Sequence, residues 1–243
     1  MTEKTFNKWF NTFILVGMAV VTVAVTAFKL KDAEGGEALL IVSAVGSLMG
    51  VLSTVCAANG RILTFLFGLI DVSIYGAVCL LGTRYGNAAL HLLYFLPMQF
   101  VGYFQWKKRG AHEEKKVRAR RLDGKQWLLY GGLFLAGLVI AYFILAALDK
   151  TEAAGVVKWL VAMDAFSMMC NILGQYLLST AYMEQWFFWI GVNVSTILMW
   201  SLTLRQDPGS SYALIYVVKY SFYLLNSLNG LRIWYNLSRG ETA

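Results

Sequence analysis

The chain has 243 residues, of which 58% are hydrophobic and 14% charged, with a net charge of +7 and a mean hydropathy of +0.57. A soluble domain carries about 25% charged residues, so this chain has too few polar side chains to cover a water-facing surface. The composition excludes an ordinary soluble globular protein and predicts a helical integral membrane protein.

Eight stretches of the chain are long and apolar enough to be membrane-spanning helices, which need about 20 mostly apolar residues. In chain order they are 10–29, 38–58, 62–82, 87–106, 127–148, 156–179, 185–204 and 212–235. The opening residues MTEKTFNKWFNTF contain no small-residue cleavage site ahead of the first stretch, so we expect an uncleaved helix there and not a signal peptide. The prediction is an all-α membrane protein with eight spans.

The connection between the fourth and fifth stretches is strongly basic. From Lys107 to Lys125 it contains nine Lys or Arg residues and three Asp or Glu residues. Such a run can bind nucleic acid, but between two spans it is more typical of a cytoplasmic loop under the positive-inside rule. We therefore expect both termini in the cytoplasm, contact between the basic loop and lipid head groups, and no nucleic-acid partner.

Two parts of the chain resemble one another. The stretch TFLFGLIDVSIYG aligns with WFFWIGVNVSTIL at an offset of 122, which pairs Asp71 with Asn193. Past the next connection the offset becomes 128 and pairs Trp106 with Trp234. Because each copy contains three spans, two copies in the same orientation need an odd number of linking helices, and the fifth stretch supplies one.

This repeat predicts a 3+1+3 arrangement of parallel helix repeats behind an extra N-terminal helix. The predicted units are the extra helix (1–37), a first three-helix repeat (38–106), a basic cytoplasmic loop with the linker helix (107–148), and a second three-helix repeat with the C-terminal tail (149–243). In transporters built from parallel repeats, the substrate lies between the halves near mid-membrane.

Acidic side chains at membrane depth are the first residues to explain, because a central Asp costs about 2.5–3.5 kcal/mol on insertion scales. Asp71 lies in the third stretch and Asp164 in the sixth. Asp164 begins a face that continues through Ser167, Met168, Asn171 and Gln175 within roughly 100° of helix surface. We expect this face to line a cavity, and hydrogen bonding between helices is the alternative.

Trp186, Trp189 and Asn193 fall within about 60° of one another on a helix in the seventh stretch. An interfacial aromatic belt is an alternative explanation for Trp186, which begins its span. The two deeper residues lie past the level of a belt, so we expect Trp189 and Asn193 to face a ligand.

Two further stretches carry polar groups that we expect to face the cavity. The last contains Tyr223, Asn226 and Asn229, and the fourth contains Gln99 two residues after Pro97. A proline frees a backbone carbonyl and favours a kink in that helix.

No catalytic or cofactor-binding motif accompanies these residues. The sequence contains no HExxH, GxSxG or Walker A pattern, and Cys56, Cys79 and Cys170 are isolated within apolar runs. We therefore expect neither a metal nor a cofactor, and a membrane enzyme is disfavoured against a transporter.

With these residues in view, the sequence resembles the PnuC family of bacterial nicotinamide riboside transporters from about residue 46 to 235. The most specific part is the pattern WxxWxxxN, formed here by Trp186, Trp189 and Asn193. Supporting stretches are FGLIDVSIYG, MDAFSMMCNILGQYLLS and LNGLRIW. Family members often have Asn where Asp71 stands, so its contact with substrate is left open.

The resemblance implies a fold related to the SWEET sugar transporters and a multi-pass protein of the bacterial inner membrane. It also implies facilitated diffusion of nicotinamide riboside, trapping of that substrate by a cytoplasmic kinase, a role in NAD biosynthesis, and a homotrimer. A SWEET-like transporter of a sugar, or of another vitamin such as thiamine or riboflavin, is the alternative.

Nicotinamide riboside has a flat cationic ring, a carboxamide and a sugar, and a flat cation gains about 0.5–2 kcal/mol from each aromatic face. The candidate aromatic walls are Trp186, Trp189, Phe67 and Tyr223. The candidate partners for carboxamide and ribose are Asn193, Gln99, Asn171, Gln175 and Asn226. Asp164 is expected to accept hydrogen bonds from the ribose hydroxyls or to balance the charge of the ring. Asp71, Met168 and Asn229 complete the predicted substrate site. With no basic side chain apparent at mid-membrane, we expect weak binding of a phosphorylated nucleotide.

Overall fold

A computed structural model describes residues 2–30, 36–83, 85–112, 115–148, 156–209 and 211–240. The regular elements within these ranges are all helices. They are α1 (Glu3–Leu30), α2 (Glu37–Ala58), α3 (Thr64–Leu81), α4 (Tyr85–Ala89), a π-helix (Leu90–Phe95), α5 (Leu96–Lys108), α6 (Gly124–Leu148), α7 (Val156–Ser179), α8 (Gln185–Gln206) and α9 (Ser211–Ser238). The predicted all-α class is confirmed.

Six helices in the described ranges are long and apolar enough to cross a membrane, namely α1, α2, α3, α6, α7 and α8. The predicted span 87–106 is divided among α4, the π-helix and α5. Pro97 stands at the start of α5 and lacks the N–H that would bond the preceding turn, so the helix is irregular where the kink was expected. The eighth predicted span lies within α9, whose 28 residues include several polar side chains.

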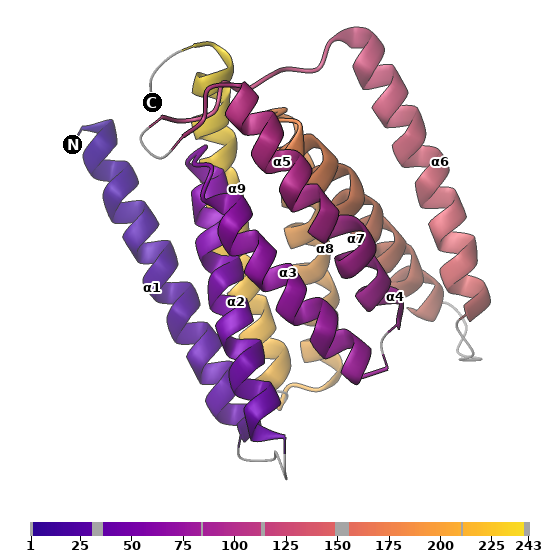
Figure 1. Cartoon of the computed structure of the whole chain (residues 1–243). Coiled ribbons are helices and arrows are strands. Elements are labelled where there is room, and N and C mark those ends of the chain that lie inside the picture. Colours follow the sequence, from indigo (N-terminus) through magenta and orange to yellow (C-terminus); the bar gives the residue numbers. More distant parts are fainter. Residues whose placement is uncertain are drawn as a thin grey trace.

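The helices form one bundle with α1 and α6 at opposite edges (Figure 1). Six of the helices close a ring, in which α2 packs on α3, α3 on α5, α5 on α7, α7 on α8, α8 on α9, and α9 on α2. Outside this ring, α1 packs on α2 and α9, and α6 packs on α7. Helix α1 begins and α9 ends at the same end of the bundle as the α5–α6 connection.

Two buried tryptophans join opposite sides of the ring at this end. The indole Nε1 of Trp106 in α5 donates to the carbonyl of Leu178 in α7 at 2.8 Å, and Nε1 of Trp234 in α9 donates to the carbonyl of Ala57 in α2, also at 2.8 Å. Both tryptophans have no exposed surface, and their ring centroids are 5.3 Å apart. We call this arrangement the tryptophan clasp, and it belongs to a core cluster that closes this end of the ring.

The basic connection is built into the same end of the bundle. The N–H of Val117 donates to the carbonyl of Gly60 at 3.0 Å, and the N–H of Arg120 donates to the carbonyl of Ala181 at 2.7 Å. Val117 is 1% exposed, and burial lowers the pKa of Lys116, which the charge of nearby Arg61 lowers further. Residues 116–122, named the strap here, therefore cross the closed end instead of forming a loose loop.

The tryptophan clasp can be tested by removing its donors one at a time. Trp106→Phe or Trp234→Phe removes one of the two donors to the carbonyl of Leu178 or Ala57 and leaves a gap where a fully buried ring packed, so we expect each to lower the free energy of unfolding by about 1–3 kcal/mol. Thermal unfolding in detergent, followed by circular dichroism, measures the loss. Trp9→Phe is the control because Trp9 is 69% exposed; a similar loss in all three variants would contradict the role of the clasp.

Candidate functional site

Helix α8 carries the predicted tryptophan and asparagine pattern on a face that packs within the bundle. Trp186 is 3% exposed, and its ring occupies the notch left by Gly230 of α9, where a Cβ would lie 2.5 Å from the indole. Trp189 is half-buried and lies against Gly174 of α7. Nδ2 of Asn193, itself 6% exposed, donates to Oγ of Ser227 at 3.0 Å. The belt explanation of Trp186 is wrong, because its side chain packs against another helix and not at a lipid interface.

The polar face of α7 becomes more buried toward the tryptophan clasp. Asp164 is exposed, Met168 and Asn171 are half-buried, and Gln175 is buried. The four residues span about 60° of helix surface. Asn171 donates to the carbonyl of Ser167 at 2.8 Å, one turn back on its own helix. This gradient describes a face that is accessible at the α7 start and closed at the opposite end.

Gln175 links that face to α5 at its closed end. Its Nε2 donates to Oγ of Ser179 at 3.2 Å, and Ser179 in turn donates to the carbonyl of Met98 at 3.1 Å. Gln99, the neighbour of Met98, is 6% exposed and donates to the carbonyl of Phe95 at 3.2 Å. The predicted residues Gln99 and Gln175 are therefore both buried, with hydrogen bonds that hold them in place.

Helix α9 divides its predicted residues between two neighbours. Nδ2 of Asn226 donates to the carbonyl of Thr54 in α2 at 3.1 Å. Asn229 instead accepts from Arg232 at 3.0 Å, and Arg232 pairs with Glu3 of α1 at 3.1 Å. Tyr223 and Asn229 point about 120° apart on the helix. The structure thus places Asn229 toward α1 and does not bring it to the face that carries Tyr223.

On α3, Phe67 and Asp71 are half-buried and lie one turn apart. The Asp71 carboxylate occupies a notch at Gly50 of α2, where a Cβ would be 2.8 Å from Oδ2. The missing side chain of Gly50 therefore leaves the space that accommodates the acidic side chain.

Several predicted residues have hydrogen-bonding capacity to spare. Within the described ranges, Nε1 of Trp186, Oδ1 of Asn226 and Nδ2 of Asn229 are buried without a hydrogen-bond partner. A buried polar atom without a partner costs roughly 1–3 kcal/mol, so such atoms mark places where water or a ligand is favoured. Trp186 and Asn226 thus each keep one buried polar atom with unused hydrogen-bonding capacity.

The sequence missed one charged residue of this region, Lys219. It is half-buried on α9, and its Nζ lies 5.8 Å from the ring centroid of Tyr216 and 5.9 Å from that of Tyr223. It interacts electrostatically with Asp71 across the bundle. The sequence pattern that could have revealed Lys219 is the i, i+4, i+7 spacing of Lys219, Tyr223 and Asn226, which puts the three residues on one face of the helix.

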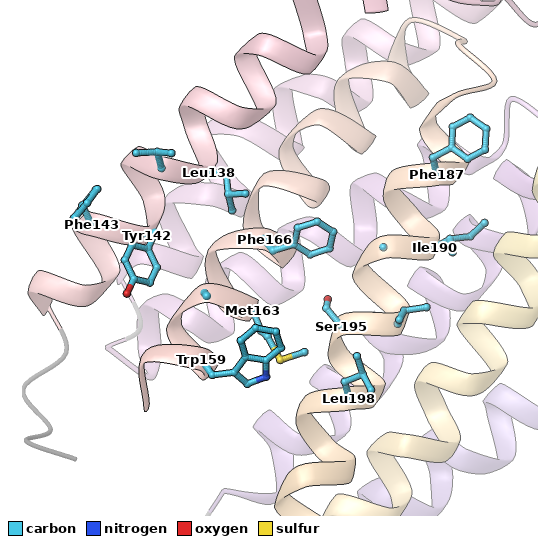
Figure 2. Close-up of a pocket in the computed structure, with 14 residues that line it drawn as sticks. Leu138, Tyr142, Phe143, Trp159, Met163, Phe166, Phe187, Ile190, Ser195 and Leu198 are labelled. Atoms are coloured by element: carbon cyan, nitrogen blue, oxygen red, sulfur yellow. The ribbon is translucent and has the colours of Figure 1, made fainter. Parts of the chain in front are cut away.

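An apolar groove of about 750 Å³ lies on the other side of α8, between α6, α7 and α8. Figure 2 shows Tyr142 of α6, Phe166 of α7, and Ile190 and Ser195 of α8 around it. None of the predicted substrate-site residues is among those that line it. Its hydrocarbon walls do not suit a polyhydroxyl substrate, which leaves the inward face of α8 as the candidate site.

Comparison with known proteins shows the family of the chain. A family model described as nicotinamide mononucleotide transporter matches residues 40–236. The chain belongs to this family. The match begins inside α2, so α1 lies outside the part that defines the nicotinamide mononucleotide transporter family.

Relatives in this family are similar over most of their length. The nicotinamide riboside transporter PnuC of Neisseria mucosa is 33% identical over 199 residues, which cover 80% of this chain and 72% of that protein. The nicotinamide riboside transporter PnuC of Haemophilus influenzae is 31% identical over 237 residues, covering 97% and 95%. The crystal structure of the vitamin B3 transporter PnuC superposes with a TM-score of 0.68 at 28% identity, covering 100% of this chain and 94% of that one.

The packing of the Trp186 ring into the notch at Gly230 is expected to hold α8 against α9, and this can be tested by filling the notch. Gly230→Ala places a methyl group where the Trp186 ring lies, so we expect the free energy of unfolding to fall by about 1–3 kcal/mol and the tryptophan emission to shift. Gly131→Ala is the matched control, because nothing lies within 4 Å of a Cβ there. Thermal unfolding and fluorescence of both variants check the prediction, and equal behaviour would refute it.

Proposed function

We propose that this chain carries nicotinamide riboside across the bacterial inner membrane by facilitated diffusion. The observation that carries the proposal is the inward face of α8, where Trp186, Trp189 and Asn193 form the WxxWxxxN pattern. The family membership supports a transporter, and the Neisseria and Haemophilus relatives, which are nicotinamide riboside transporters, support the same substrate. Trapping by a cytoplasmic kinase, entry of the product into NAD biosynthesis and assembly as a homotrimer are further parts of this proposal.

The family description and the relatives differ on the substrate, since one refers to the mononucleotide and the others to the riboside. A phosphate dianion needs cationic or strongly donating partners. The predicted site offers the amides of Asn193, Asn226 and Gln175; the structure adds one cation, Lys219, which already interacts with Asp71. This chemistry favours the uncharged ribose, so we place the riboside before the mononucleotide.

Trp189 is the preferred wall for the cationic ring. It is half-buried, whereas Trp186 is packed against Gly230 and Trp234. The carboxamide and ribose would then form hydrogen bonds with Asn193, Asn171 and Gln175. The remaining apolar contacts with the substrate would come from Phe67, Met168 and Tyr223. In this proposal Asp164 meets the substrate first, and Asn229 has a structural role toward α1.

Eight spans in a 3+1+3 arrangement are the topology that we propose. The tryptophan clasp supports it, because the bonds from Trp106 to Leu178 and from Trp234 to Ala57 are related by offsets of 128 and 121. The two turns that hold the strap, at Gly60 and Ala181, are also 121 residues apart and both have positive φ, +67° and +62°.

These contacts favour a register one residue away from the sequence alignment. Phe65 packs edge-on to Trp106 with centroids 4.9 Å apart, and Trp186 packs edge-on to Trp234 at 6.3 Å. The equivalence of Phe65 with Trp186 is an offset of 121, not 122. One residue rotates a helix by about 100°, so Asp71 and Asn193 do not occupy equivalent positions in this register. We propose the same four structural units as predicted from the sequence, namely 1–37, 38–106, 107–148 and 149–243.

The substrate is tested by uptake into proteoliposomes. We expect uptake of labelled nicotinamide riboside, competed by the unlabelled riboside and not by thiamine, riboflavin or glucose. Asn193→Ala should reduce uptake by at least about tenfold, because a buried polar contact to the ligand is worth more than roughly 1.4 kcal/mol. Asn87→Ala, at an exposed asparagine, is the control. Unchanged uptake by folded Asn193→Ala protein would exclude this face, and competition by glucose or thiamine would favour the alternative substrates.

The orientation is tested by cysteine labelling in intact cells. In a chain whose three native cysteines are replaced by Ala, Gly209→Cys after α8 should react with a membrane-impermeant maleimide, whereas Gly124→Cys at the start of α6 should react only after lysis. The physical reason is the basic connection, which the positive-inside rule holds in the cytoplasm. The reverse pattern would invert the proposed topology.

A further inference from the structure

Two opposite charges lie at mid-helix in this bundle. Asp71 is the eighth of the 18 residues of α3, and Lys219 is the ninth of the 28 residues of α9. A lysine near a helix end can extend its ammonium group to the interface. The Nζ of Lys219 instead lies almost equally far from Tyr216, one turn before it, and Tyr223, one turn after it. Its charge is therefore held at the level of its own turn.

Both side chains are half-buried in the bundle. On α3, Leu66 and Ile70 form an exposed apolar side that lies about 120° from Asp71, while Tyr75, one turn after Asp71, is also exposed. On α9, Leu214 and Leu225 form an exposed apolar side that lies about 130° from Lys219.

The notch at Gly50 of α2 holds the Asp71 carboxylate. The bond from Asn226 to the carbonyl of Thr54 sets α9 one turn past Gly50 on α2, so Lys219, two turns before Asn226, lies near the level of Asp71, with which its charge interacts.

The neighbouring charges are few among the described residues. Lys29 at the end of α1 interacts electrostatically with Lys219, and Tyr223 interacts with Asp71. An unpaired charge in the membrane interior is strongly unfavourable, so each member of the pair stabilises the charged form of the other. The pair is close to neutral when no ligand is present.

We propose that Asp71 and Lys219 form a charge-selectivity pair for the transported substrate, with Lys219 as a specificity-determining residue. The inference rests on the proposed function, in which the substrate has a cationic pyridinium ring. Asp71 provides the counter-charge for this ring as it passes, and Lys219 provides the counter-charge for Asp71 in the empty protein. Lys219 also limits the affinity for the cation, because Asp71 cannot hold it without losing part of its interaction with the ammonium group.

The test compares the cationic riboside with its neutral dihydropyridine form, which has the same sugar and carboxamide without the ring charge. In proteoliposomes, Asp71→Asn should raise KM for the cation by about tenfold or more and change KM for the neutral form by less than about twofold. Lys219→Met should lower both KM and the maximal rate for the cation, because release becomes slower. The double variant should transport both forms with similar KM.

Matched controls are Asp207→Asn and Lys125→Met, which remove the same charges at exposed positions. Equal effects of Asp71→Asn on the two substrates, or a double variant that still discriminates between them, would overturn the proposal. Wild-type protein that carries neither riboside would refute the proposed function instead. Thermal unfolding in detergent tests whether Asp71 and Lys219 interact, whatever the transport result. Each single variant should be less stable than the double variant, and single variants as stable as wild type would overturn the proposed pairing.

Discussion

The arrangement of the bundle depends on two indole N–H groups that donate across the ring of helices at its closed end. Trp106 and Trp234 each reach a backbone carbonyl at the end of the helix opposite, and both are fully buried. Each of these carbonyls also accepts a backbone N–H, from Ala181 at Leu178 and from Gly60 at Ala57, so the indole supplies a second donor that ties the helix end to the opposite side of the ring. The strap adds backbone bonds over the same end, so the closure involves the two three-helix units and their connection.

Glycines determine how near the functional helices approach one another. At Gly230 the space of a missing side chain accommodates Trp186, at Gly174 it accommodates the edge of Trp189, and at Gly50 it accommodates the Asp71 carboxylate. Interfaces between membrane helices favour small residues because lipid provides little drive for association and close packing must replace it. In this protein the same notches also orient the side chains of the candidate site, which links helix packing to substrate binding.

Helix α8 separates two environments that differ in chemistry. Its inward face carries Trp186 and Asn193, both buried and in contact with α9, whereas its outer face contributes Phe187 and Ile190 to the apolar groove. Because the helix repeats every 3.6 residues, adjacent residues in the sequence fall on different sides. The polar face of α7 is exposed at one end and buried at the other, toward the tryptophan clasp.

The sequence by itself determined the helical class, the positions of six long apolar helices and the polar face of α7, because hydropathy and the 3.6-residue period are local properties. It also singled out Trp186 and Asn193 through their spacing. Only the tertiary structure decided that Trp186 packs inside the bundle, that Asn229 turns to α1, and that Lys219 interacts with Asp71. These outcomes depend on which helices are neighbours and on their rotation, and residues far apart in the chain reveal neither until the helices pack.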